Sequence, residues 1–152
     1  MALLLVLFLV VGLTAGLVLG LIDNRSSSEL FEAGEEAFRQ AEYEKAIELY
    51  EKGLEKKPDY SAGYNLLGMA YRFTFNKTGS AAARQKEIMA FRKAIELDPD
   101  NFVAYVNLGT TLFYHGSAKE GAVYLKKALE LYPGHPDRAA IEEMIRQAEP
   151  GP

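Results

Sequence analysis

Residues 91–100 read FRKAIELDPD, and residues 125–133 repeat this pattern as LKKALELYP. A related segment, AIELYEKGLEKKPD, occurs upstream at residues 46–59. Pro99 and Pro133 are 34 residues apart, and the equivalent proline of the upstream segment precedes Pro99 by 41 residues. The chain therefore contains three related units, and the middle unit carries seven additional residues.

The three units also begin alike. The middle unit reads YNLLGMAY at residues 64–71, the third reads YVNLGTTL at residues 105–112, and the first reads LFEAGEEA at residues 30–37. These residues and the 34-residue period resemble the tetratricopeptide repeat family, whose pattern is W-x₂-L-G-x₂-Y…A-x₃-F…P. The resemblance covers about residues 27–133 and implies an all-α array of stacked helix pairs.

Elementary helix rules agree with this resemblance. Apolar residues recur at steps of three and four residues within residues 43–54, which indicates an amphipathic helix. The glycine of each unit lets its two helices approach closely, and the proline ends the second helix. We predict three helix pairs followed by a capping helix that covers the last pair. The predicted bounds are 29–149 for the domain, about 27–60, 61–101 and 102–135 for the repeats, and 136–148 for the capping helix.

Residues 23–28 form a short polar linker before the repeats. Ser26 and Glu29 have the spacing of a capping box, in which each side chain accepts a hydrogen bond from the other residue's backbone N–H. The first helix of the domain is therefore predicted to start near Ser27.

The additional residues of the middle unit fall within residues 73–86. We predict a loop at Thr74–Ser80 and a helix, lengthened at its start, at Ala81–Leu97. Insertions in repeat arrays often make contacts, and Phe75 is apolar for such a position. Glu87 stands where the second helix of the family normally has a small alanine, which suggests a local shift of register; Gly121 occupies the same position in the third unit.

Residues 3–22 read LLLVLFLVVGLTAGLVLGLI, with Thr14 as the only polar residue. A helix of this length spans roughly 30 Å, the thickness of the hydrocarbon core of a bilayer. We predict that residues 1–22 form an N-terminal transmembrane helix and that the protein is a single-pass membrane protein. The alternatives are a cleaved secretory signal and a buried soluble helix; no basic residue precedes the apolar run, which disfavours the signal. The Lys and Arg count leans toward a cytoplasmic repeat domain, but the side of the membrane stays open.

Three glycines of this segment, Gly12, Gly16 and Gly20, are four residues apart and lie close to one stripe of a helix. Small residues on one stripe let two helices pack closely in lipid. The predicted contact is with a second copy or with another membrane subunit.

Several function classes lack the residues they need. The net charge is −4 and no cluster of Lys and Arg appears, so nucleic-acid binding is not expected. The chain has no cysteine, and its two histidines, His115 and His135, have no partner in a metal-binding pattern. No nucleotide-binding or nucleophile pattern is present. We therefore expect no cofactor, no metal and no enzymatic activity.

The resemblance implies that the first helix of each pair lines a concave groove that binds other proteins. Carried over by position, the residues of this groove are aromatic, aliphatic and polar, a mixture found in protein interfaces. The chaperone-binding members of the family clamp a C-terminal carboxylate with Lys and Asn; Phe31 and Glu35 stand at those places here, which does not support that activity. The predicted partner-binding residues, with Phe75 from the insertion, are Phe31, Glu35, Phe38, Arg39, Asn65, Met69, Arg72, Phe73, Phe75, Val106, Thr110, Phe113 and Tyr114.

The sequence thus predicts a membrane-anchored scaffold for protein–protein interactions. Its partners would include membrane subunits, and it would act as an accessory subunit or as an assembly factor of a membrane complex. The alternative is a secreted or periplasmic repeat module released by cleavage near Ile22, and an enzyme is the remote third reading.

Overall fold

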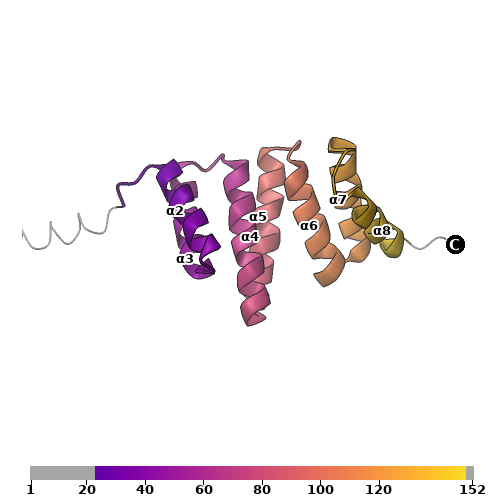
Figure 1. The fold of residues 1–152 in the computed structure, drawn as a ribbon, viewed down its shortest axis with the longest axis horizontal. Helices are drawn as coiled ribbons and strands as arrows, with labels where there is room; N and C mark the ends of the chain where they lie inside the picture. The colour runs from indigo at the N-terminus through magenta and orange to yellow at the C-terminus, as the bar shows by residue number, and fades with distance from the viewer. Residues whose placement is uncertain (1–22, 150–152) are drawn as a thin grey trace, which may run out of the picture.

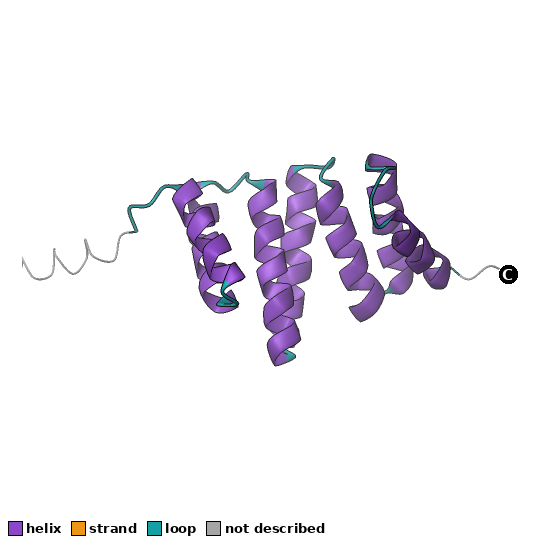
Figure 2. Ribbon diagram, in the orientation of Figure 1, coloured by secondary structure: helices purple, strands orange, loops and turns teal. Residues whose placement is uncertain are grey.

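A computed structural model describes residues 23–149, which are all-α (Figures 1 and 2). Within these residues the chain forms seven helices and no strand. The helices are α2 (Ser27–Arg39), α3 (Tyr43–Lys56), α4 (Ser61–Thr78), α5 (Ala81–Leu97), α6 (Phe102–His115), α7 (Ala118–Leu131) and α8 (Arg138–Ala148).

The helices stand side by side as three pairs, α2/α3, α4/α5 and α6/α7, with α8 against the last pair (Figure 1). Successive pairs pack through α3 with α4 and through α5 with α6. The buried side chains between them are mostly Leu, Ala, Phe and Tyr, and Leu30, Phe91, Leu108 and Leu125 have no exposed surface. The predicted helical repeat array is confirmed.

The start of α2 follows the predicted capping box. Ser26 is the N-cap, its hydroxyl accepts from the backbone N–H of Glu29, and the Glu29 carboxylate accepts from the backbone N–H of Ser26 at 2.7 Å. Two of the N–H groups that the first turn leaves without a partner are satisfied in this way.

Close approach within each pair depends on glycine, as the sequence predicted. A Cβ atom at Gly68 of α4 would lie 2.5 Å from the ring of Phe91 on α5. In the third pair a Cβ atom at Gly109 would lie 2.7 Å from Leu125. Gly121 faces the same contact, and a Cβ atom there would lie 2.6 Å from the carbonyl oxygen of Gly109. Any larger residue would push the paired helices apart.

The predicted loop at Thr74–Ser80 is wrong. α4 remains helical to Thr78, and the turn into α5 consists of Gly79, with φ +69°, and Ser80. The second pair has helices of 18 and 17 residues, against 14 and 14 in the third pair, so the seven extra residues lengthen both helices by about one turn. The predicted span of α5, Ala81–Leu97, is correct.

The structure also corrects the predicted membrane location. Among residues 23–149 no helix is both long enough and apolar enough to cross a bilayer. Membrane subunits as partners likewise have no support in these residues. The apolar segment on which those predictions relied, with Gly12, Gly16 and Gly20, lies outside the described residues.

Candidate functional site

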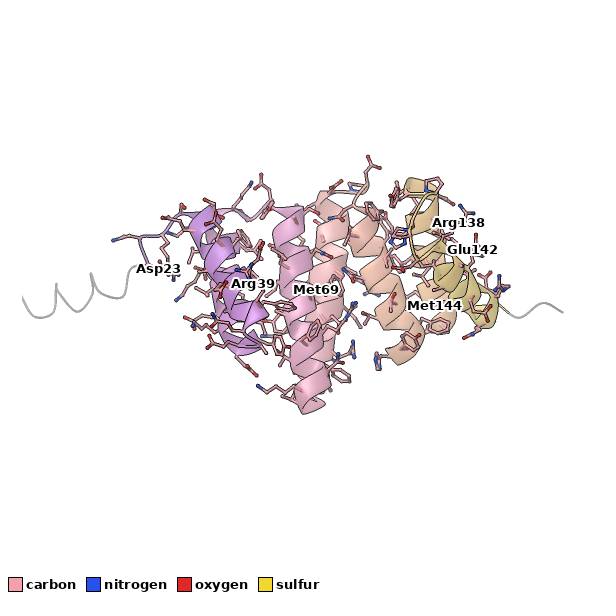
Figure 3. All side chains as sticks on the ribbon, in the orientation of Figure 1. Asp23, Arg39, Met69, Arg138, Glu142 and Met144 are labelled. Carbon is pink, nitrogen blue, oxygen red and sulfur yellow. The ribbon has the colours of Figure 1, made fainter. Side chains whose placement is uncertain are left out.

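A hollow of about 300 Å³ lies between the first helices of the first two pairs. Figure 3 labels two of its residues, Arg39 on α2 and Met69 on α4. We call it the first-helix hollow. Its lining residues are Glu35, Phe38, Arg39, Tyr50, Leu66 and Met69. Four of the predicted groove residues therefore meet at one place.

The floor and walls of the first-helix hollow are apolar, and its charges lie at the rim. Tyr50 is 1% exposed, and burial raises the pKa of its hydroxyl to about 12, with a further contribution from the negative charge of Glu35. The guanidinium of Arg39 is bound to Glu36 on the same helix, and hydrogen bonds from Arg39 and Gln40 lower the pKa of Glu36. Glu35 forms no hydrogen bond or ion pair with any side chain between residues 23 and 149, but its negative charge contributes to raising the pKa of Arg39, one turn further along α2.

A second hollow, of about 490 Å³, adjoins the first at the start of α2, and Glu35 lines both. We call it the N-terminal hollow. Phe31 forms part of its lining but is 6% exposed, because its ring packs on Tyr50 at 6.0 Å and on Tyr60 at 5.0 Å between centroids. Phe31 thus belongs to the core more than to the surface. The other lining residues are Ser26, Ser27, Ser28, Glu32, Lys57 and Tyr60.

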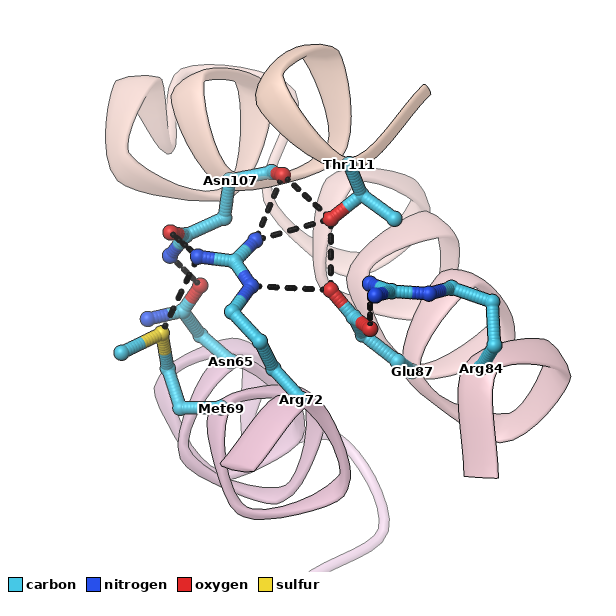
Figure 4. A network of polar contacts seen from close by, with 7 residues as sticks. All are labelled: Asn65, Met69, Arg72, Arg84, Glu87, Asn107 and Thr111. Carbon is cyan, nitrogen blue, oxygen red and sulfur yellow. Dashed lines mark hydrogen bonds and ion pairs between the residues drawn. The ribbon is translucent and has the colours of Figure 1, made fainter. Parts of the chain in front are cut away.

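A polar network occupies the space between α4, α5 and α6 (Figure 4). At its centre is Glu87, a carboxylate with no exposed surface. Glu87 Oε1 accepts from Arg72 Nε at 2.9 Å and from the Thr111 hydroxyl at 2.5 Å, and Glu87 Oε2 accepts from Arg84 Nη1. A buried carboxylate requires such compensation.

Arg72 is a member of this network that was also predicted to bind a partner. Besides Glu87, its guanidinium donates to Asn107 Oδ1 at 3.0 Å, to the Asn107 carbonyl at 2.7 Å and to Thr111 at 2.8 Å. Asn107 in turn donates to Asn65 Oδ1 at 2.9 Å, which draws a second predicted groove residue into the network. The hydrogen-bonding groups of Arg72 are thus committed to the interior.

Arg84 is less well compensated. Its side chain is 10% exposed, Nη1 donates to Glu87, and Nε and Nη2 are buried with no acceptor among the described residues. The guanidinium stacks on the ring of Phe75 at 3.7 Å. Burial lowers the pKa of Arg84.

The remaining predicted residues lie at two places. Phe73 and Phe75 stand at the lengthened end of α4, where Phe73 packs edge-on against Phe38 at 5.1 Å and Phe75 against His115 at 5.4 Å. On α6, Tyr114 is 64% exposed. The other three predicted groove residues on α6 are half-buried: Val106, Thr110 and Phe113.

A comparison with protein families finds one repeat in this chain. The family described as tetratricopeptide repeat matches residues 90–120, which include the second half of α5, all of α6 and the first turn of α7.

Solved structures have the same arrangement of helices. The first TPR domain of Spaghetti (RPAP3), bound to the HSP90 peptide SRMEEVD, matches with a TM-score of 0.72 at 23% identity and covers 84% of this chain and 95% of that chain. The Yersinia enterocolitica chaperone SycD, in complex with a peptide of the translocator YopD, matches with a TM-score of 0.70 at 14% identity and covers 80% and 91%. Residues 23–149 form a tetratricopeptide-like array.

Curated relatives match part of this array. The antiviral innate immune response effector IFIT1 of Macaca fascicularis is 37% identical over 90 residues, which are 57% of this chain and 18% of that protein. A clustered mitochondria protein homolog of Aspergillus clavatus is 32% identical over 88 residues, 53% of this chain and 7% of that protein. The chain spans less than a fifth of the length of these relatives.

The array has surface features that the sequence pattern missed. Tyr50 and Leu66 complete the first-helix hollow, although neither was among the predicted groove residues. On the outer side a hollow of about 490 Å³ lies between α3 and α5, where Met89 is 68% exposed. The sequence pattern gives no sign that Met89 is exposed, because a large apolar side chain in an amphipathic helix is expected to be buried. The central place of Glu87 could not be deduced, since its partners come from three helices.

The described part of the array contains no candidate metal site, and its two histidines lie apart. No group of three or more His, Asp and Glu residues between 23 and 149 could hold a metal ion. His115 ends α6 beside Phe75, and burial lowers its pKa, while His135 accepts from the backbone N–H of Asp137 at 3.0 Å.

Proposed function

We propose that this chain is a protein-interaction module that binds an extended segment of a partner along the first helices α2, α4 and α6. The observation that carries the proposal is the first-helix hollow, which brings Phe38 and Met69 from two different pairs to one apolar depression. Binding sites for proteins commonly have an apolar centre with polar groups around it.

The half-buried residues beyond the hollow support a longer contact. Val106 and Thr110 on α6 continue the row of predicted groove residues from the second pair to the third. The Spaghetti domain and SycD, which share this fold, are each described in complex with a peptide. We propose that the whole predicted set of partner-binding residues, apart from those committed to the core or to the polar network, contacts the partner.

Two modes of action are consistent with such a groove. In the first, the chain is a resident subunit of a protein complex and is recovered in a fixed ratio with its partners. In the second, it is an assembly factor that binds its clients for a limited time and is recovered in smaller and variable amounts.

Site-specific photo-crosslinking tests the proposal on the full chain. A benzoylphenylalanine at Phe38, inside the first-helix hollow, is compared with one at Met89, on the outer side. In extracts of the source cells we expect discrete protein adducts from position 38 that are absent from position 89. Adducts that form only at position 89 would place the binding surface on the outer side, and identical adducts at both positions would refute a specific groove.

A further inference from the structure

We propose that the segment bound in the groove is apolar and basic: a large apolar side chain fills the first-helix hollow, and a neighbouring Lys or Arg pairs with Glu35. This inference rests on the proposed function and specifies the partner's chemistry. It follows from the shape of the hollow and from the charges that the fold leaves free along the first helices.

The apolar half of the inference comes from the hollow itself. Its volume of about 300 Å³ and its lining by Phe38, Leu66 and Met69 suit one large aliphatic or aromatic side chain. Met69 adds adaptability, because an unbranched thioether side chain adjusts to different shapes. The ring of Tyr50 closes the floor, since it is 1% exposed.

The basic half of the inference comes from Glu35. This residue is exposed, lines both the first-helix hollow and the N-terminal hollow, and has no bonded cation among residues 23–149. A partner segment that runs from one hollow to the other must pass it. A lysine or arginine at that point gains a charge-assisted hydrogen bond, whereas an acidic residue is repelled.

The cations near the groove are outnumbered by carboxylates, because Arg39 and Lys57 face Glu32, Glu35 and Glu36. Arg39 is bound to Glu36, and Arg72 is bound to Glu87 and to oxygens of α6. Lys57, in the N-terminal hollow, lies 4.4 Å above the ring of Tyr60 and shares that hollow with Glu32 as well as Glu35.

Acidic segments are therefore disfavoured here. The peptide SRMEEVD, which the Spaghetti domain binds, carries two glutamates and an aspartate. In this chain such a peptide would meet the carboxylate of Glu35, and the Arg39 guanidinium beside it is already shared with Glu36.

The test is a selection from a phage-displayed library of random nonapeptides with the full chain as bait. The selected peptides are then synthesised, and their affinities are measured by fluorescence anisotropy against the wild type, Glu35→Gln and Glu35→Lys. The matched control is Glu55→Gln, which makes the same change of charge on an exposed residue of α3 that lines neither hollow. A second peptide series replaces each Lys or Arg by Gln.

We expect selected peptides to be enriched in a large apolar residue next to Lys or Arg. Glu35→Gln should weaken their binding by about two- to fivefold at low salt, Glu35→Lys should weaken it further, and Glu55→Gln should leave it unchanged. Peptides whose Lys or Arg is replaced by Gln should lose affinity for the wild type but not for Glu35→Gln.

Other outcomes overturn the proposals separately. Selected peptides that are acidic or uncharged, with equal affinity for wild type and Glu35→Gln, refute the apolar and basic partner but keep a peptide-binding groove. A library that yields no binder above background refutes the groove itself, and the inference falls with it.

Discussion

Substitution of Glu87 by alanine tests how much of the stability of the array depends on one buried carboxylate. Glu87 has no exposed surface, and it compensates Arg72 of α4 and Arg84 of its own helix. Removing it leaves two guanidinium groups at the junction of the second and third pairs. We expect a large loss of stability, and we expect it at this junction.

The size of the loss follows from what each arginine keeps. Arg84 is 10% exposed, loses its only hydrogen-bond acceptor and retains the ring of Phe75. Arg72 is 20% exposed and retains the oxygens of Asn107 and Thr111. Breaking a buried ion pair costs about 3–5 kcal/mol, and the contacts that Arg72 keeps favour the lower end, about 3 kcal/mol. In a domain of this size that lowers Tm by roughly 10 °C.

Arg84→Met is the informative comparison. Glu87 then keeps Arg72 and the Thr111 hydroxyl, and the two buried N–H groups that lack acceptors disappear. We expect the stability of Arg84→Met to lie within about 1 kcal/mol of the wild type, because a buried arginine is replaced by an apolar side chain of similar length. The double variant Glu87→Ala/Arg84→Met should be more stable than Glu87→Ala alone.

Urea unfolding followed by circular dichroism at 222 nm measures these differences, and amide hydrogen exchange locates them. In Glu87→Ala the amides of α6 and α7 should exchange faster than those of α2 and α3, since repeat arrays are coupled through neighbouring units. Equal losses in Glu87→Ala and Arg84→Met, or strictly additive losses in the double variant, would refute the role assigned to the carboxylate.

Two further predictions concern the packing of the pairs. Gly68→Ala should lower the free energy of unfolding, measured in urea, by about 1–3 kcal/mol, because the added Cβ atom would lie 2.5 Å from the buried ring of Phe91. The control is Gly134→Ala, where the atom nearest to the added Cβ is 3.8 Å away. A loss in Gly68→Ala no larger than the loss in Gly134→Ala would contradict this prediction. Tyr50→Phe should have nearly the same free energy of unfolding as the wild type at pH 7. Between pH 10 and pH 12 the wild type should lose about 1–2 kcal/mol of this stability, and the variant should keep it. The reason is that the pKa of Tyr50 is raised from 10.0 to about 12 in the folded state, which therefore favours the neutral phenol. Parallel pH curves of the two proteins would show that Tyr50 does not titrate in this way.

The parts of the fold that depend on local chemistry were predictable from the sequence. The capping box at Ser26, the close approach at Gly68 and the end of α5 before Pro99 each follow from a residue and its near neighbours. The sequence predicted a loop at Thr74–Ser80, but most of this segment is helical. Both helices are longer by about one turn, and this extension leaves no hydroxyl of the threonines in the segment without a hydrogen bond. The Thr74 and Thr78 hydroxyls donate to backbone carbonyls one turn back, and Gly79 supplies the left-handed residue that ends α4.

The candidate site was predictable only in outline. The family resemblance placed Phe38 and Met69 in one groove, and the structure brings both to the first-helix hollow. Helical periodicity does not distinguish a residue at the surface of the groove from one beneath it. Phe31 lies beneath, held by the rings of Tyr50 and Tyr60, because these rings fill the space that glycines leave between helices.

Glu87 connects the interior of the array to the chemistry of its groove. An alanine at this position, as the family pattern has it, would leave Arg72 without its carboxylate partner, although its guanidinium would keep the oxygens of Asn107 and Thr111. The buried carboxylate instead holds Arg72 in the network between α4 and α6. Because Arg39 is shared with Glu36, Glu35 leaves a net negative charge at the first-helix hollow. Replacing Glu87 removes one negative charge from the junction beside the groove, so the preference for a basic segment should weaken as the stability of the second junction falls.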